Sequence, residues 1–167
     1  MERSPRPPWR GKKTGPSPVD RAKQGAKRSL CVEGGGVPVA LSVAGANRND
    51  FKLLEQTLQS FARAKPKPTR AKPQHMLLDK GYDYEEVRAI LQAHGLIAHI
   101  RSRGEEAEDK KKQLGKKARR WVVERSHSWF NRFRSILTRW CKKERNYLGM
   151  LFFVCGLIAY RAALFFG

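Results

Sequence analysis

The stretch HMLLDKGYDYEEVRAILQAHGLIAHI, residues 75–100, decides the fold class of this chain. It begins with a short apolar run that ends in Asp79, which predicts a buried strand. Val87 and Leu91 follow at helical spacing and predict a helix, and the apolar residues 96–100 predict a second strand. Because strand, helix and strand in this order are typical of parallel pairing, the sequence predicts an α/β fold.

Upstream of this stretch the sequence predicts a hairpin and a helix. Alternating apolar residues at 27–33 and 37–44 predict two strands, and the glycines at 34–36 supply the turn between them. Asp50 is a suitable N-cap for the helix expected over residues 51–61. The hairpin therefore adds an antiparallel side to the expected mixed sheet.

A long amphipathic helix is expected from residue 117 to about 145. Its polar face carries Glu124, opposite an apolar stripe and among cationic side chains. From spacing alone, the favoured interpretation of Glu124 is a solvated residue in ordinary ion pairs. The stripe consists of Val122, Trp129, Phe133, Ile136 and Trp140.

The predicted organisation has three parts. Residues 1–26 are basic and rich in Pro and Gly, so they are expected to be extended or disordered. Residues 27–145 form the expected core, and residues 146–167 an apolar helix that packs on it. The apolar run at 147–166 also has the length of a membrane span. A buried helix is favoured because the upstream elements need a partner for their apolar faces.

The net charge of +20 is concentrated in two blocks. Residues 1–30 carry +7 and residues 110–145 carry +12, whereas residues 31–109 are neutral. Such blocks point to nucleic acid or an anionic membrane as the partner. A non-catalytic DNA- or RNA-binding protein and a basic membrane-anchored protein are therefore alternatives to an enzyme.

Several kinds of site are not indicated by the sequence. The three cysteines include no CxxC pair, and the four histidines show no spacing typical of metal ligands. No GxGxxG or P-loop motif occurs, so no nucleotide cofactor is expected. Asp79 and Glu124, 45 residues apart, are candidate ligands for Mg²⁺, which prefers carboxylate oxygens. Asp79 could equally be a turn or N-cap residue.

Four motifs resemble bacterial insertion-sequence transposases of the DDE type, in order and at similar spacing over residues 11–160. They are KTGPSPVDRAKQGAKRSL (13–30), VALSVAGANRNDFKLLE (39–55), LLDKGYDYEEVRAILQAHGLIAHIRSRGEE (77–106) and ARRWVVERSHSWFNRFRSILTRW (118–140). The resemblance implies a ribonuclease-H-like fold. It also implies an active site of Asp, Asp and Glu that holds two Mg²⁺ or Mn²⁺ ions.

By motif, Asp79 matches the second Asp of the family and Glu124 matches the Glu. The resemblance implies that both bind metal and are catalytic in cutting transposon ends and joining them to target DNA. It also implies double-stranded DNA as the partner, and multimers as the acting form. The expected DNA contacts are Lys116, Lys117, Arg119, Arg120, Arg125, Asn131, Arg132 and Arg134.

The chain departs from the family at its start. The family places the first Asp on a strand upstream of the segment that resembles residues 13–30, but MERSPRPPWRG contains no Asp. Asp20 and Glu33 are not convincing substitutes, and the N-terminal helical region of such transposases is not found. We therefore expect the C-terminal part of a bacterial, cytoplasmic, nucleoid-associated transposase. Alone it should bind DNA without cleaving it. Two alternatives are open: a catalytically inactive DNA-binding remnant of a disrupted gene, and one of two reading frames, in which an upstream-frame polypeptide supplies the missing Asp.

Overall fold

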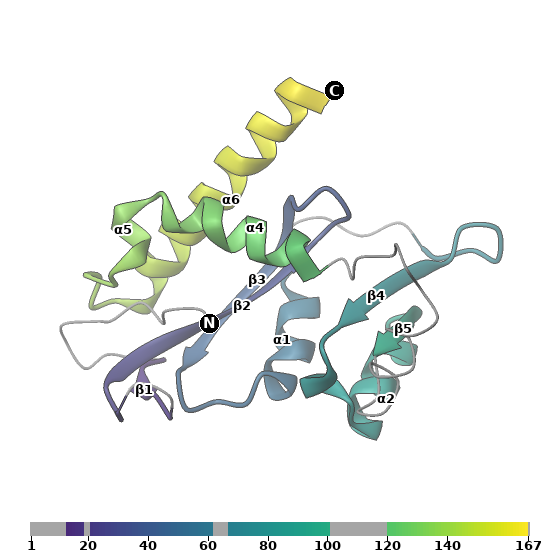
Figure 1. Ribbon diagram of the computed structural model, residues 1–167, viewed down its shortest axis with the longest axis horizontal. Coiled ribbons are helices and arrows are strands. Elements are labelled where there is room, and N and C mark those ends of the chain that lie inside the picture. The colour runs from purple at the N-terminus through teal and green to yellow at the C-terminus, as the bar shows by residue number, and fades with distance from the viewer. Residues whose placement is uncertain (1–12, 19–20, 62–66, 101–119, 167) are drawn as a thin grey trace, which may run out of the picture. The chain divides into compact units, whose positions relative to one another are not determined.

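The chain forms two compact units (Figure 1). The first comprises residues 1–63 and 119–167, and the second residues 64–118. The expectation of a mixed α/β chain with an apolar C-terminal helix is confirmed. The described strands form two sheets, one antiparallel and one parallel, where a single mixed sheet was expected. The computed structural model describes residues 13–18, 21–61, 67–100 and 120–166.

The first unit is built on the predicted hairpin. Strands β2 (Gln24–Val32) and β3 (Pro38–Gly45) pair antiparallel, with an irregularity in the register between Cys31 and Val32. The short strand β1 (Gly15–Pro16) pairs with the start of β2. The turn between β2 and β3 needs glycine at Gly36, whose φ is +88°, in the left-handed region.

Helices cover both faces of the hairpin, as the alternation of strand side chains requires. The 3-10 turn η1 (Phe51–Leu53) and helix α1 (Leu54–Gln59) lie on one face. There the Thr57 hydroxyl lies 2.7 Å from the Ser42 hydroxyl of β3. Asp50 occupies the N-cap position of η1 as expected, but its side chain makes no capping hydrogen bond. Its carboxylate instead lies 3.3 Å from the Lys27 ammonium.

The opposite face of the hairpin packs against the C-terminal helices. Here the expected single helix is wrong, because the chain forms α4 (Arg120–Asn131), α5 (Arg134–Leu137) and α6 (Glu144–Phe166). The chain is extended at Phe133 and Thr138, which interrupts the helix on both sides of α5.

The interruption has a packing reason. Phe130 and Ile136 are both fully buried in the same core, 1% and 0% exposed. On one straight helix these two residues would point about 120° apart, at the two edges of a buried face, whereas the interruption lets both point into the core. The expected stripe is wrong at Trp140, which is 64% exposed. The stripe is correct at Val122 and Ile136, which are buried, while Trp129 is half-buried against the core.

Helix α6 begins in the core and ends in solvent. Tyr147, Leu151, Val154 and Ile158 are buried with Leu41 and Val43 of β3 and with Phe130 of α4. The rest of the helix continues away from the hairpin (Figure 1). By length and composition alone, residues 144–165 could also cross a membrane, with a mean hydropathy of 2.0.

The second unit is a strand–helix–strand motif, as predicted. Strands β4 (Gln74–Leu78) and β5 (Leu96–Ile100) pair in parallel, and helix α2 (Glu85–Ala93) connects them after the 3-10 turn η2 (Lys80–Tyr82). Gly95, with φ +67°, ends α2. The small core of this unit includes Val87, Leu91 and Leu96, which are buried.

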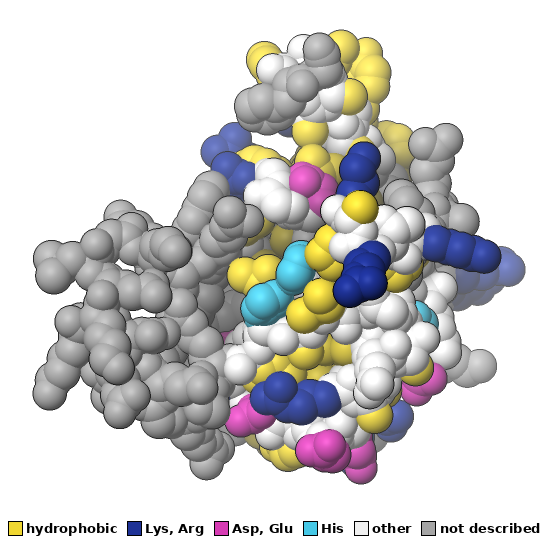
Figure 2. All heavy atoms as spheres, turned by 90° about the vertical axis from the view of Figure 1, so that its right-hand side faces the viewer, with side chains coloured by type: hydrophobic (Ala, Val, Ile, Leu, Met, Phe, Trp, Pro, Cys, Tyr) yellow, Lys and Arg dark blue, Asp and Glu magenta, His cyan; other side chains and the backbone are white. Residues whose placement is uncertain are grey.

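The face of β4 and β5 that carries His75 and His99 is exposed, so the expectation of a buried strand is wrong for this face. The Nδ1 atom of His75 lies 2.7 Å from Nε2 of His99. Leu77 and Ile97, 56% and 46% exposed, complete this face. Figure 2 shows histidine side chains lying among hydrophobic ones. A two-stranded sheet with an apolar exposed face is marginally stable by itself.

The cysteines are free thiols and all three are half-buried. Burial raises the pKa of Cys31 to about 11. It raises the pKa of Cys155 to about 11 as well. Both thiols therefore stay protonated near neutral pH and are poor nucleophiles and poor metal ligands. Their role in the first unit is packing.

Candidate active site

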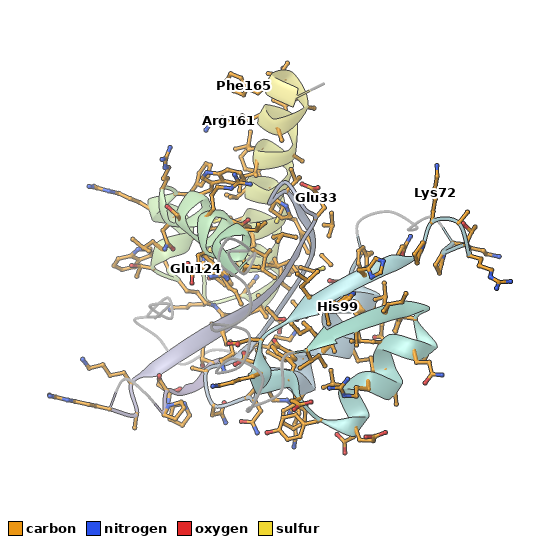
Figure 3. The ribbon with its side chains drawn as sticks, turned by 45° about the vertical axis from the view of Figure 1, so that its right-hand side comes forward. Glu33, Lys72, His99, Glu124, Arg161 and Phe165 are labelled. Carbon is orange, nitrogen blue, oxygen red and sulfur yellow. The ribbon has the colours of Figure 1, made fainter. Side chains whose placement is uncertain are left out.

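Glu124 lies on the outward face of α4 (Figure 3). The inward face is formed by Val122, Ser126 and Phe130, which are spaced four residues apart and are all buried. Glu124 is exposed, on the opposite side of the helix from these three. Among the side chains that the structure describes, which leave out Arg120 one helical turn before it, none makes a hydrogen bond or ion pair with its carboxylate. The exposure of Glu124 agrees with the solvated position expected from spacing alone, and it also leaves the carboxylate accessible to a ligand.

Two neighbours of Glu124 attach α4 to the turn of the hairpin. Ser126 donates a hydrogen bond of 2.6 Å from its hydroxyl to the Gly36 carbonyl, across 90 residues of sequence. Arg125 donates to the Gly35 carbonyl, and its guanidinium stacks 5.0 Å from the centre of the Trp129 ring. These contacts fix where the helix segment that carries Glu124 lies relative to the hairpin.

Replacing Ser126 by Ala is expected to lower the free energy of unfolding by about 1–3 kcal/mol. The buried Gly36 carbonyl would lose its hydroxyl donor, and no water can reach a site where Ser126 is 0% exposed. Urea denaturation at neutral pH measures this change. The matched control is Ser128→Ala on the exposed side of the same helix, expected within about 0.5 kcal/mol of the parent. Equal effects of the two substitutions would contradict the role of Ser126.

A buried cation supports the C-terminal end of α4. Arg28 of β2 is 6% exposed, and its guanidinium carbon lies 5.9 Å from the centre of the Phe130 ring. Its Nη2 atom also donates to Asn131 Oδ1 at 3.4 Å. The aromatic face and the amide oxygen are favourable neighbours for a buried guanidinium. It therefore adds positive potential beneath the outward face of α4.

Asp79 lies in the second unit, directly after β4. It is the N-cap of η2, and its Oδ1 atom accepts a hydrogen bond of 2.8 Å from the Lys80 amide. The turn-residue interpretation of Asp79 is thus correct as far as this oxygen is concerned. The side chain is exposed, so the structural role does not exclude a second one.

The structure brings some of the predicted site residues together and leaves others apart. Arg120, Arg125 and Asn131 share α4 with Glu124, and Arg132 and Arg134 follow at its end, both exposed. Asn131 and Arg125 also have the intramolecular partners given above. Asp79 and Glu124 belong to different units. Outside the described residues lie Lys116, Lys117, Arg119 and Asp20.

The carboxylates fit a hard divalent cation in their chemistry. Both Asp79 and Glu124 offer exposed oxygen atoms, the ligands that Mg²⁺ prefers. In the part of the chain that the structure describes, no three His, Cys, Asp or Glu side chains are close enough together to hold a metal. Glu33 is used otherwise, since its Oε1 atom accepts from the Val37 amide at 3.1 Å within the hairpin turn.

Comparison with known proteins gives this arrangement its context. Residues 4–159 match the family described as transposase DDE domain. The chain belongs to this family. It is also 33% identical, over 154 residues, to a protein from Burkholderia cepacia named as a transposase for insertion sequence element IS402. That alignment covers 91% of this chain and 71% of the relative. No solved structure matches the chain.

Membership of the transposase DDE domain family agrees with the resemblance found in the sequence, and it connects the chain to DNA transposition and to insertion sequences. It also implies DNA as a partner and divalent metal in general. Sequence reasoning assigned Gly36 to the hairpin turn but missed Ser126 and its hydrogen bond to Gly36, which positions α4. The sequence offers one indication of this contact, a serine on the apolar side of the expected helix. It does not identify the partner, because the two residues are 90 positions apart.

Proposed function

We propose that this chain is a transposase core that binds double-stranded DNA through the outward face of α4 and the basic residues around it. The observation that carries the proposal is Glu124, an exposed carboxylate on the outward face of a helix that is followed by exposed Arg132 and Arg134. Cations beside an acid suit a site that holds both a metal and a phosphate. Transposon ends and target DNA are the proposed ligands, with the protein acting in the bacterial cytoplasm at the nucleoid.

Asp79 and Glu124 are the proposed metal ligands, for Mg²⁺ or Mn²⁺. Their motifs match the second and third carboxylates of the family, and the order of elements supports a ribonuclease-H-like arrangement. That order is a hairpin, a helix, a strand followed directly by Asp79, a second helix, a parallel strand and the helix with Glu124. When bound, such metal ions activate the attacking hydroxyl and stabilise the leaving oxygen.

The 167-residue chain is proposed to be unable to cleave DNA alone. Residues 1–11 contain no Asp that could match the first carboxylate of the family, and Glu33 is engaged in the hairpin turn. A third carboxylate would then come from outside these 167 residues, for example from the product of an upstream reading frame. Without it the chain is a basic protein that binds DNA.

Substituting either carboxylate by its amide is expected to weaken Mn²⁺ binding by more than the roughly 10-fold loss typical of removing an outer-shell partner. Asp79→Asn and Glu124→Gln keep the shape of each side chain but remove the charge that attracts the cation. The electron paramagnetic resonance signal of free Mn²⁺, measured against the purified 167-residue chain, gives the affinity. Glu86→Gln, an exposed acid on α2, serves as the control.

Unchanged Mn²⁺ affinity in both variants would contradict the metal site and leave a plain DNA-binding protein.

The claim that the chain cannot cleave DNA alone is tested separately, with supercoiled plasmid and Mg²⁺. Nicking by the purified chain that Asp79→Ala abolishes would show that the two carboxylates suffice.

A further inference from the structure

The outward face of α6 is a large apolar surface on an otherwise highly charged protein. Phe152, Phe153, Tyr160 and Leu164 are 45%, 67%, 62% and 65% exposed. Their positions in the helix place them opposite the buried residues from Tyr147 to Ile158. Soluble proteins seldom leave a continuous apolar patch of this kind in water unless something binds it.

A line of small residues runs along the middle of this face. Gly149, Gly156 and Ala163 recur every seven residues, so they lie on nearly the same side of the helix. A Cβ atom added at Gly149 or Gly156 would meet no atom of the described residues within 4 Å. Glycine inside a helix costs about 1 kcal/mol relative to alanine, and packing within the described part of the chain gives no reason for either one. Small residues at such positions allow a second helix to approach closely.

We propose that α6 is a self-association surface, on which two copies of this chain pair through antiparallel α6 helices centred on Gly156. Gly149 and Ala163 are each seven residues from Gly156, so a two-fold axis through Gly156 places small residues opposite small residues. The large side chains on both sides of this line then pack around the contact.

The distribution of charge favours a second copy in this orientation. Lys142, Lys143 and Arg145 surround the start of α6, whereas Arg161 is the one charged residue in the sequence from 146 to 166. Antiparallel pairing puts the basic start of one helix beside the C-terminal end of the other, where the helix dipole is negative. Parallel pairing would put two basic clusters together.

The exposed apolar area of α6 is sufficient for a specific but small interface between two copies. Given that aromatic side chains bury about 150–250 Å² each, the four exposed side chains offer on the order of 450 Å² per copy. Together with the backbone at the glycines, two copies would bury roughly 1,000 Å², near the lower limit for specific complexes. A micromolar dimer is therefore expected.

A bilayer is the competing occupant of an apolar helix. Tyr147, Leu151, Val154 and Ile158 are buried against β3 and its neighbours, so one side of α6 is already committed to the protein core. A helix that spans a membrane needs lipid or other membrane helices on every side. Crossing a bilayer would require α6 to leave the core of the first unit.

The test uses the full chain, freed of nucleic acid, in sedimentation velocity from about 1 to 100 µM and at roughly 0.5 M salt, which prevents bridging by DNA. A concentration-dependent dimer is expected. Gly156→Leu should weaken it at least tenfold, because the side chain separates the helices at the two-fold axis. Leucine favours helix, so this variant keeps its fold. Ala89→Leu, on the exposed side of α2, is the matched control and should not change the dimer.

Cross-linking tests the orientation independently. With a bismaleimide, Gly156→Cys should give covalent dimers, because the two copies of residue 156 face one another. Gly149→Cys should not, because antiparallel pairing separates its two copies by 14 residues, about 21 Å along the helix. Efficient cross-linking of Gly149→Cys would overturn the antiparallel arrangement.

Two further results would overturn the proposal altogether. One is a monomer at every concentration, or a dimer that neither Gly156→Leu nor Phe153→Ala weakens. The other is a monomer that floats with vesicles of phosphatidylcholine and phosphatidylglycerol and loses this property in Phe153→Ala. Neither result bears on the proposed metal site, because Mn²⁺ binding is measured at Asp79 and Glu124.

Discussion

The affinity of the chain for duplex DNA is expected to fall by roughly 10³–10⁵ between 50 and 200 mM salt. This range corresponds to the neutralisation of six to ten phosphates. A Lys or Arg side chain that binds a phosphate displaces its counterions into solution. The block of +12 over residues 110–145 supplies more than enough cations for that number of contacts. Fluorescence anisotropy with a labelled duplex at several salt concentrations gives the slope.

Substitutions on the two sides of the first unit locate the contact. Replacing both Arg132 and Arg134 by Gln should reduce the salt slope by about two, because each phosphate contact contributes about one. The control is the pair Arg48→Gln and Lys52→Gln, exposed cations near α1 on the other face of the hairpin. Equal losses in both double variants would mean that binding is diffuse and that α4 has no special part in it.

Replacing Phe130 by Ala is expected to lower the free energy of unfolding by about 3–5 kcal/mol. The ring is 1% exposed at the meeting point of β2, α4 and α6, so its removal leaves a cavity. The substitution also removes the aromatic face beside the Arg28 guanidinium, 5.9 Å from the ring centre. That buried cation would be left next to empty space.

The effect of Phe130→Ala on the free energy of unfolding is best compared with that of Trp140→Ala. The apolar stripe read from the sequence assigns Trp140 to the core, whereas the structure has it 64% exposed. Its replacement is therefore expected to change the free energy of unfolding by less than about 1 kcal/mol. Urea denaturation of both variants distinguishes the two arrangements. A larger loss for Trp140→Ala than for Phe130→Ala would favour one continuous helix from 117 to 145.

Local periodicity predicted the parts of the fold in which each element has its own pattern. Residues 27–44 alternate with a period of two around three glycines, and Val87 and Leu91 repeat at helical spacing, so the hairpin and α2 follow from sequence. The interruption after Asn131 could not be predicted in this way. No Pro or Gly marks it, and it arises because Phe130 and Ile136 must reach the same core.

The candidate site was predictable only through motifs. Spacing by itself favoured a solvated surface residue at Glu124, and it did not distinguish a metal ligand from a turn residue at Asp79. The resemblance to the transposase family predicted both as metal ligands. The residues that hold α4 in place were not predictable, because Ser126 meets Gly36 from 90 residues away and a hydroxyl on the inward side of a helix carries no distinctive pattern.

The division of the first unit into residues 1–63 and 119–167 has a consequence for the order in which the chain folds. During synthesis the hairpin leaves the ribosome long before α4 and α6. One of its apolar faces therefore stays exposed to solvent while the second unit is translated. Closing the first unit then joins segments about 100 residues apart, which makes this step slow relative to the local strand–helix–strand motif. The local contacts of the second unit are therefore expected to form first, as an insertion within a domain that is still incomplete.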